Sequence, residues 1–120
     1  METTPDATFE GSHEHSLDGW DIVHGDSTDW MPWGGDGSLA RAKVLGTGDG
    51  YVLVVVEASA GYEGDPHVHS NAEMSYVVSG TVEHQGVPMK SGDGYVAARG
   101  STHSRFVVTS DATYVLAFKL

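Results

Sequence analysis

The chain has 120 residues, no cysteine and a formal net charge of −11 at pH 7. This length predicts one domain with a single hydrophobic core, and the lack of cysteine excludes disulfide bonds and thiolate metal sites. The acidity disfavours nucleic acids and anionic membranes as partners. No apolar run approaches the ~20 residues that cross a bilayer, and the first residues lack the pattern of a signal peptide. These features predict a soluble, cytoplasmic protein.

The N-terminal third differs from the remainder in charge. Residues 1–37 contain nine acidic residues and no Lys or Arg, whereas residues 38–120 contain eight acidic and six basic residues. Residues 1–19 are polar with little apolar content, which predicts a flexible acidic arm. Its His13-Glu14-His15 motif has no further ligand nearby, so we do not interpret it as a metal site. We expect residues 20–120 to form the single domain.

All three tryptophans, Trp20, Trp30 and Trp33, lie in an otherwise polar segment over residues 20–36. Rings of this size have to bury against another part of the protein. We expect this N-terminal extension to pack on the outside of the domain or to close one end of it. A contact with a second copy of the chain is the alternative.

From residue 38 onward the sequence predicts short strands separated by glycine-rich turns, and no substantial helix. Residues 39–46 alternate, which places Ala40, Ala42 and Val44 on one face and Arg41 on the other. Residues 51–58 are apolar on both faces, which predicts a strand between the core and a covering sheet. Further strands are expected at 67–69, 74–79, 81–85, 87–90, 95–98, 105–109 and 113–119. The pattern indicates an all-β protein.

Two histidines and a carboxylate mark a candidate metal site. In an extended strand, residues two apart share a face, so His67 and His69 project in the same direction. A turn at residues 70–72 lets Glu73 return from the same side, and His103 is placed to complete the set. Imidazole and carboxylate ligands suit a divalent transition metal, whereas structural zinc sites usually contain cysteine.

These residues resemble the first sequence motif of the cupins. The pattern Gly61-x5-His67-x-His69-x3-Glu73-x6-Gly80 matches that motif at every defined position. The resemblance covers roughly residues 37–120. It implies a double-stranded β-helix, or jelly-roll, barrel.

The pattern Gly92-x7-Gly100-x2-His103 resembles the second cupin motif. Ala98 and Val107 replace the proline and the asparagine that are usual there, and neither position is a metal ligand. The resemblance therefore implies a metal held by the three histidines and Glu73. The alternative is that Glu73 does not bind the metal itself and instead holds one of the histidine ligands in place. The resemblance also implies a homodimer.

Strand alternation predicts the pocket beside the metal. If Glu73 points inward, Ser75 and Val77 follow it, and Tyr76 points outward. If His103 points inward, Arg105 and Val107 follow it. We therefore expect a substrate pocket formed by Ser75, Val77, Arg105 and Val107. Glu73 is the candidate catalytic base, and Arg105 is the candidate group that neutralises a substrate oxyanion.

Other titratable residues have weaker signals. Alternation does not settle the direction of Tyr95, for which packing is the expected role. His24 and His84 have no partner at a ligand spacing, and we expect both at the surface.

The segment Trp30–Leu45 resembles the entry of the compact cupins, which include acetylacetone-cleaving and dihydroxyacetophenone dioxygenases. This implies a non-haem Fe(II) dioxygenase that cleaves a small diketone, hydroxyketone or catechol-like substrate. One alternative is a redox-neutral lyase or isomerase with Mn, Ni or Zn. Another is a non-catalytic metal- or ligand-binding sensor, similar to the cupin halves of some anti-sigma factors.

Overall fold

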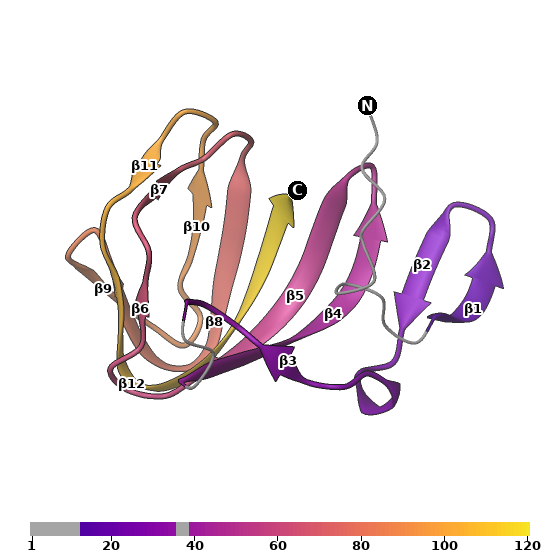
Figure 1. The fold of residues 1–120 in the computed structure, drawn as a ribbon, viewed down its shortest axis with the longest axis horizontal. Coiled ribbons are helices and arrows are strands. Elements are labelled where there is room, and N and C mark those ends of the chain that lie inside the picture. Colours follow the sequence, from indigo (N-terminus) through magenta and orange to yellow (C-terminus); the bar gives the residue numbers. More distant parts are fainter. Residues whose placement is uncertain (1–12, 36–38) are drawn as a thin grey trace.

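The computed structural model describes residues 13–35 and 39–120, and this part of the chain is built almost entirely of β-strands (Figure 1). A single turn of 3-10 helix spans Gly25–Ser27. The strands are β1 (His13–Leu17), β2 (Trp20–Val23), β3 (Met31–Pro32), β4 (Ala40–Gly48), β5 (Tyr51–Ala58), β6 (Glu63–Gly64), β7 (His67–Val68), β8 (Glu73–His84), β9 (Val87–Lys90), β10 (Gly94–Ala97), β11 (Thr102–His103) and β12 (Phe106–Lys119). None of the described segments forms a helix long and apolar enough to cross a membrane.

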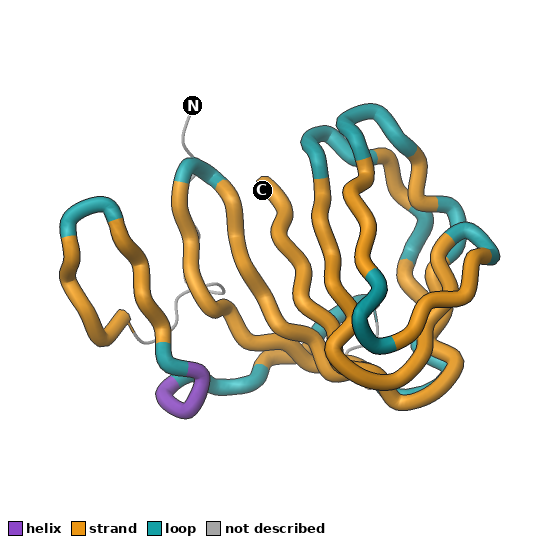
Figure 2. The backbone as a smooth tube through the Cα atoms, turned by 180° about the vertical axis from the view of Figure 1, so that it is seen from behind, coloured by secondary structure: helices purple, strands orange, loops and turns teal. Residues whose placement is uncertain are grey.

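The main sheet has the strand order β10-β8-β12-β5-β4-β3, with β6 paired to β12 and β9 paired to β8. Strands β7 and β11 pair with each other, and β1 pairs with β2. All these pairs are antiparallel. The sheet bends strongly, so that β6, β7 and β11 lie across from β4 and β5 (Figures 1 and 2). The architecture is the predicted jelly roll, in which long bent strands pass from one layer to the other.

The core lies on the inner side of this bend. Strand β4 buries Ala40, Ala42 and Val44 and leaves Arg41 exposed, as its alternation predicts. Among the described residues, the largest side chains that are less than 2% exposed are all valines, from β5, β8 and β12: Val52, Val54, Val56, Val77, Val82 and Val108. Burial of each valine stabilises the fold by about 1.5–3 kcal/mol relative to an exposed position. β-Branched side chains suit this role because they pack well on a pleated surface.

Strands β8 and β12 are longer than the sequence predicts. The expected break near Gly80 is absent, because β8 continues through it to His84. Gly80 has φ of 78°, and a Cβ at this position would overlap the carbonyl oxygen of Asp111 in β12. The register of β12 with β8 also shifts between Val108 and Tyr114. Glycine therefore allows the two strands to pass closely where they bend, and it does not end either of them.

The N-terminal segment forms a hairpin beside the barrel. Strand β1 occupies residues 13–17, within the region expected to be a flexible arm, while residues 1–12 lie outside the described part of the chain. The hairpin is attached to the outer end of β4 (Figure 1). There, Oδ2 of Asp21 accepts a hydrogen bond of 2.8 Å from the backbone N–H of Thr47.

Two of the three tryptophans pack against the barrel as expected. The ring of Trp30 lies over the Arg41 guanidinium, 4.3 Å from its central carbon, on the outer side of β4. Trp33 packs against Phe118, with ring centroids 6.1 Å apart, at one end of the barrel. Trp20, in the hairpin, is 71% exposed. The segment thus both covers the outside of β4 and closes part of one end.

Candidate metal centre

Three imidazole rings converge at one end of the barrel. The ligand nitrogens of His67, His69 and His103 all lie within 4.8 Å of one another. His67 and His103 are directly opposite in the β7–β11 ladder, which places their side chains on the same face. Hydrogen bonds between the backbones of His69 and Gly100 (2.7 Å) and of His69 and Ser101 (2.9 Å) continue this pairing. The two cupin-like motifs are therefore joined at the histidines.

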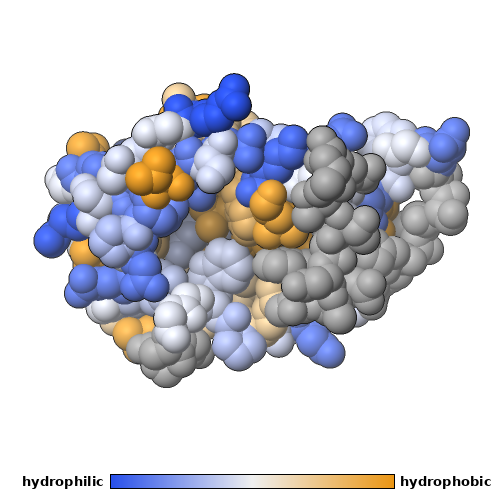
Figure 3. Space-filling view, turned by 45° about the horizontal axis from the view of Figure 1, so that its top comes forward, coloured by the Kyte–Doolittle hydropathy of each residue, from blue (hydrophilic) through white to orange (hydrophobic). Residues whose placement is uncertain are grey.

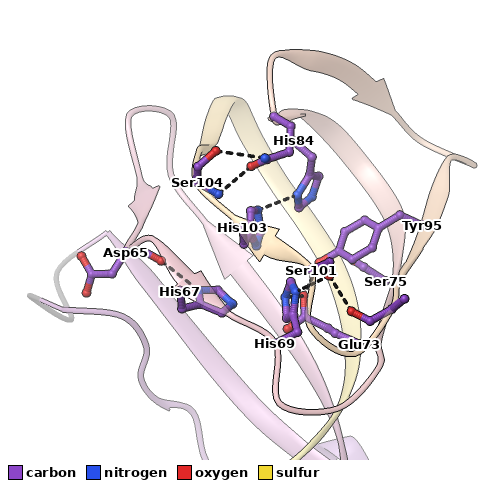
Figure 4. Close-up of polar contacts among 12 residues, drawn as sticks. Asp65, His67, His69, Glu73, Ser75, His84, Tyr95, Ser101, His103 and Ser104 are labelled. Atoms are coloured by element: carbon purple, nitrogen blue, oxygen red, sulfur yellow. Dashed lines mark hydrogen bonds and ion pairs between the residues drawn. The ribbon is translucent and has the colours of Figure 1, made fainter.

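Hydrogen bonds on the far side of two rings set their tautomers. Nδ1 of His67 lies 2.9 Å from the carbonyl oxygen of Asp65, which can only accept, so Nδ1 carries the proton. Ser101 Oγ donates to the carbonyl of Ala98 at 2.6 Å, which leaves it as the acceptor for Nδ1 of His69 at 3.0 Å. These residues are drawn together in Figure 4. Nε2 of both histidines therefore keeps its lone pair. This arrangement is typical of histidine ligands held by outer hydrogen bonds.

Nε2 of His69 provides a direct test of whether a metal fits. This atom is buried and has no hydrogen-bond partner among the described residues. A buried lone pair without a partner costs free energy unless a cation or donor meets it. Three neutral imidazoles are also a suitable donor set for a divalent transition metal. The residues present therefore form a cluster that can hold such an ion.

His84 belongs to this region, so its predicted surface position is wrong. Its Nδ1 lies 3.0 Å from Nε2 of His103, and its ring stacks on Phe106 at 4.5 Å between centroids. Burial, and then the neighbouring His103, lower the pKa of His84 to about 4. Burial, and then His67, lower the pKa of His103 as well. Both rings are thus neutral at pH 7. The available sequence signal was the apolar Val82, two residues earlier and therefore on the same face of β8, where the structure buries it.

Glu73 lies at the border of the histidine cluster. Its Oε2 is 3.7 Å from Nε2 of His69, and both side chains are largely buried. The hydroxyl of Tyr95 donates a hydrogen bond to the same carboxylate oxygen (Figure 4). Burial, and then this contact with Glu73, raise the pKa of Tyr95 above its usual range, so the phenol stays protonated. Tyr95, whose direction the sequence left open, therefore belongs to the site.

The site opens into a cavity of about 580 Å³. Figure 3 shows a recess with hydrophilic residues on one side and hydrophobic residues on the other. The apolar lining comes from Trp33, Tyr62, Phe106, Tyr114, Leu116 and Phe118, and the polar lining includes the three histidines, Glu73, His84 and Tyr95. A mainly apolar cavity with a few convergent polar groups suits a small organic ligand.

Ser75 and Val77 point inward as expected, but neither is among the residues that line the cavity. Ser75 is buried and its hydroxyl donates to the carbonyl oxygen of Val115 at 2.9 Å. Val77 is 1% exposed and belongs to the hydrophobic core. Both residues therefore belong to the packed layer beneath the site and do not line the cavity.

Arg105 and Val107 also lie outside the cavity lining, and Arg105 is exposed. The prediction assumed that alternation continues from His103, but β11 ends there and β12 begins at Phe106. Oε1 of Gln85 accepts hydrogen bonds from the backbone N–H groups of Ser104 and Arg105, at 2.7 and 2.9 Å. This interruption makes Phe106 the inward residue.

The comparison with known families agrees with this geometry. Residues 19–119 match the family described as the ChrR cupin-like domain. The chain belongs to this cupin family. The match covers most of the sequence, including both histidine-bearing motifs and the tryptophan segment. A search of curated proteins found no match to the chain. Membership confirms the predicted relationship with the cupins.

Solved structures show the same cupin fold at low sequence identity. The anti-sigma factor ChrR of Rhodobacter sphaeroides, in complex with SigE, has a TM-score of 0.67 and 20% identity over 80% of this chain; the match spans about half, 52%, of that chain. A putative acetylacetone dioxygenase from Methylibium petroleiphilum has a TM-score of 0.74 and 16% identity, and the match covers 88% of this chain and 80% of that one. KdgF from Halomonas has a TM-score of 0.69 and 23% identity, and the match covers 83% of this chain and 93% of that one. These likenesses establish the fold.

Proposed function

We propose that this cupin is a metal-dependent enzyme acting on a small organic molecule, and that it is a non-haem Fe(II) dioxygenase. The observation that carries this proposal is the position of the three histidines, which border a cavity of about 580 Å³ with aromatic walls. A purely structural metal site is closed by protein ligands, whereas a catalytic site keeps room for substrate. The substrate class is a diketone, hydroxyketone or catechol-like compound, whose adjacent oxygens can act as a bidentate ligand.

His67, His69 and His103 would hold the ion, with Glu73 as the fourth ligand. When bound, Fe(II) supplies Lewis acidity toward the substrate oxygens and redox chemistry with dioxygen. Tyr95 orients the Glu73 carboxylate through its hydrogen bond. The protonated phenol of Tyr95 is also the proton donor next to this carboxylate.

The aromatic wall would bind the carbon skeleton of the substrate. Phe106, Tyr114 and Phe118 present ring surfaces to the cavity, and Leu116 adds an aliphatic contact. These side chains exclude water and orient the substrate beside the histidines. Arg105 is exposed outside the cavity and has no part in this proposal.

A redox-neutral lyase or isomerase with Mn, Ni or Zn is the second candidate. The Tyr95–Glu73 pair favours it, because such a reaction needs an acid and a base beside the substrate, and both side chains line the cavity. The family description favours a third role, a metal- or ligand-binding sensor that acts on a partner protein, since ChrR itself is an anti-sigma factor in complex with SigE.

Metal analysis and oxygen uptake together test these functions. The protein is purified without added metal and its metal content is measured by mass spectrometry. The Fe(II)-loaded protein is then given diketones, hydroxyketones and catechols in an oxygen electrode. We expect iron and substrate-dependent oxygen uptake. Turnover without oxygen uptake supports the second candidate, whereas tight binding of a small ligand without any turnover supports the sensor.

A further inference from the structure

Tyr114 is a buried phenol on the inner face of β12. It is 4% exposed, and it lines the cavity beside the metal centre. Its direct partners in the sheet are Val77 of β8 and Val56 of β5, which are both buried in the hydrophobic core. Phe106 meets the ring of Tyr114 edge-on, with 5.5 Å between the ring centroids. This close packing fixes the ring, so its hydroxyl is a fixed group of the cavity.

The hydroxyl of Tyr114 forms no hydrogen bond with any residue in the described part of the chain. Two other hydroxyls at the site show the usual pattern. Ser75 donates to the carbonyl oxygen of Val115 at 2.9 Å, and Tyr95 donates to the carboxylate of Glu73. A buried hydroxyl without a partner destabilises a folded protein, because it loses its hydrogen bonds to water and gains none.

Packing alone does not account for a tyrosine at this position. A phenylalanine at 114 would give the same ring contacts as Phe106 and Phe118, which line the same cavity, without burying a polar atom. The phenol adds one group that can donate a hydrogen bond. Burial, and then Tyr62 and Glu73, raise the pKa of Tyr114 above its usual range, so the hydroxyl keeps its proton. The cavity therefore contains a donor that lacks an acceptor.

This donor lies among the polar groups of the cavity. The charge of Glu73 acts on Tyr114, and Tyr114 in turn acts on Tyr95. Tyr62, on the aromatic side of the cavity, acts on Tyr114 as well. The hydroxyl is thus within electrostatic range of the carboxylate at the metal centre. In a cavity of about 580 Å³, a ligand that reaches the histidines also comes within reach of this hydroxyl.

We propose that Tyr114 donates a hydrogen bond to a substrate oxygen that is separate from the two oxygens facing the histidines. This inference rests on the proposed function, and it narrows the substrate class to compounds with a third oxygen. Because Glu73 is near, a neutral carbonyl or hydroxyl oxygen fits better than a carboxylate. Tyr114 then determines specificity, since a compound without the third oxygen leaves the buried hydroxyl unpaired.

Binding to the zinc-loaded protein tests this proposal without turnover, because Zn²⁺ has no redox chemistry. Two pairs of probes differ by one neutral oxygen-bearing group: catechol with 3,4-dihydroxybenzaldehyde, and pentane-2,4-dione with heptane-2,4,6-trione. Titration calorimetry under nitrogen gives the Kd of each probe. We expect the third oxygen to strengthen binding to the wild type by about three- to tenfold in at least one pair. Tyr114→Phe should remove this gain and leave the Kd of catechol and of pentane-2,4-dione unchanged.

Two controls separate recognition from a structural role. Tyr76→Phe removes a hydroxyl from a residue that is 50% exposed and lies outside the cavity lining, and it should keep the wild-type gain. Urea unfolding without metal or probe then compares Tyr114→Phe with the wild type. We expect Tyr114→Phe to be at least as stable, because it loses a buried polar atom that has no partner within the protein.

The proposal is overturned if the wild type shows no gain from the third oxygen in either pair, or if Tyr114→Phe keeps that gain. It is also overturned if Tyr114→Phe unfolds at a lower urea concentration than the wild type, because the hydroxyl then has a structural partner. Failure of the proposed function gives a different result. In that case the gain depends on Tyr114, but the Fe(II)-loaded protein takes up no oxygen with any of the four probes.

Discussion

The Tyr95 hydroxyl donates its hydrogen bond to the same oxygen of Glu73 that lies 3.7 Å from Nε2 of His69. Two strands meet at this contact, because Tyr95 belongs to β10 and Glu73 begins β8. A residue that holds a metal-binding carboxylate in place commonly contributes ten- to hundredfold to metal affinity. We therefore expect Tyr95→Phe to lower metal affinity by about tenfold while the protein remains folded. Competition with a chromophoric chelator measures the change.

The control for that experiment is Tyr76→Phe, which removes the same hydroxyl from a side chain of β8 that is 50% exposed. Its metal affinity should equal that of the wild type. Equal affinities in Tyr95→Phe and the wild type would show that Glu73 acts without help from Tyr95.

Removal of a histidine should empty the metal site. His69→Ala and His103→Ala each leave two of the three converging imidazoles, and two do not hold a divalent ion tightly. We expect the metal content of both variants to fall below a tenth of the wild-type value. Elemental analysis measures this loss, and circular dichroism checks the fold. Stoichiometric metal in either variant contradicts the proposed ligand set.

The neutral state of His84 makes the stability of the metal-free protein depend on pH. The pKa of His84 is about 4 in the folded protein and 6.5 ordinarily, so the unfolded chain binds more protons between these values. Stability is therefore complete above about pH 6.5 and falls as the pH drops toward 4. The loss from His84 should be on the order of 1 kcal/mol, after allowance for solvent screening of a partly exposed ring.

Urea unfolding at a series of pH values, in the presence of a chelator, measures this dependence. His84→Asn keeps a polar side chain but cannot titrate in this range, so its free energy of unfolding should change less between pH 6.5 and 4. The lowered pKa of His103 leaves a residual slope in this variant. A slope identical to that of the wild type would contradict the position of His84 in the cavity.

Gly80 should be far less tolerant of substitution than Gly86. Both have positive φ, 78° and 80°, so alanine costs about 1–2 kcal/mol at either position. A Cβ at position 80 would in addition overlap the carbonyl oxygen of Asp111, whereas position 86 has no atom within 4 Å. We expect Gly80→Ala to destabilise the protein by about 2 kcal/mol more than Gly86→Ala. Chemical denaturation of both variants measures this difference, and equal losses would contradict the close passage of β8 and β12.

Local sequence was sufficient to predict most of the strands. Alternation in an extended strand has a period of two, so Ala40, Ala42 and Val44 could be assigned to the core from order alone. The same rule placed His67 and His69 on one face, and the resemblance of the second motif to the cupins implied that His103 completes the set. These properties depend on neighbours within a few residues or on a pattern that a whole family shares.

Alternation failed where a contact from another part of the chain interrupts it. Gln85 binds the backbone at residues 104 and 105, and this contact turns Arg105 outward and Phe106 inward. No residue near Arg105 in sequence signals the interruption. The inward positions of His84 and Tyr95 likewise depend on how β8 pairs with β12 and β10.

The sequence alone thus determined an all-β domain, because strand periodicity is local. Its two motifs identified three histidines for a shared cation through a pattern that the whole family has in common. Tertiary structure alone decided which other side chains surround those histidines. Strand pairing makes that choice, since it brings together residues far apart in the chain, and their order cannot specify the register at which they meet.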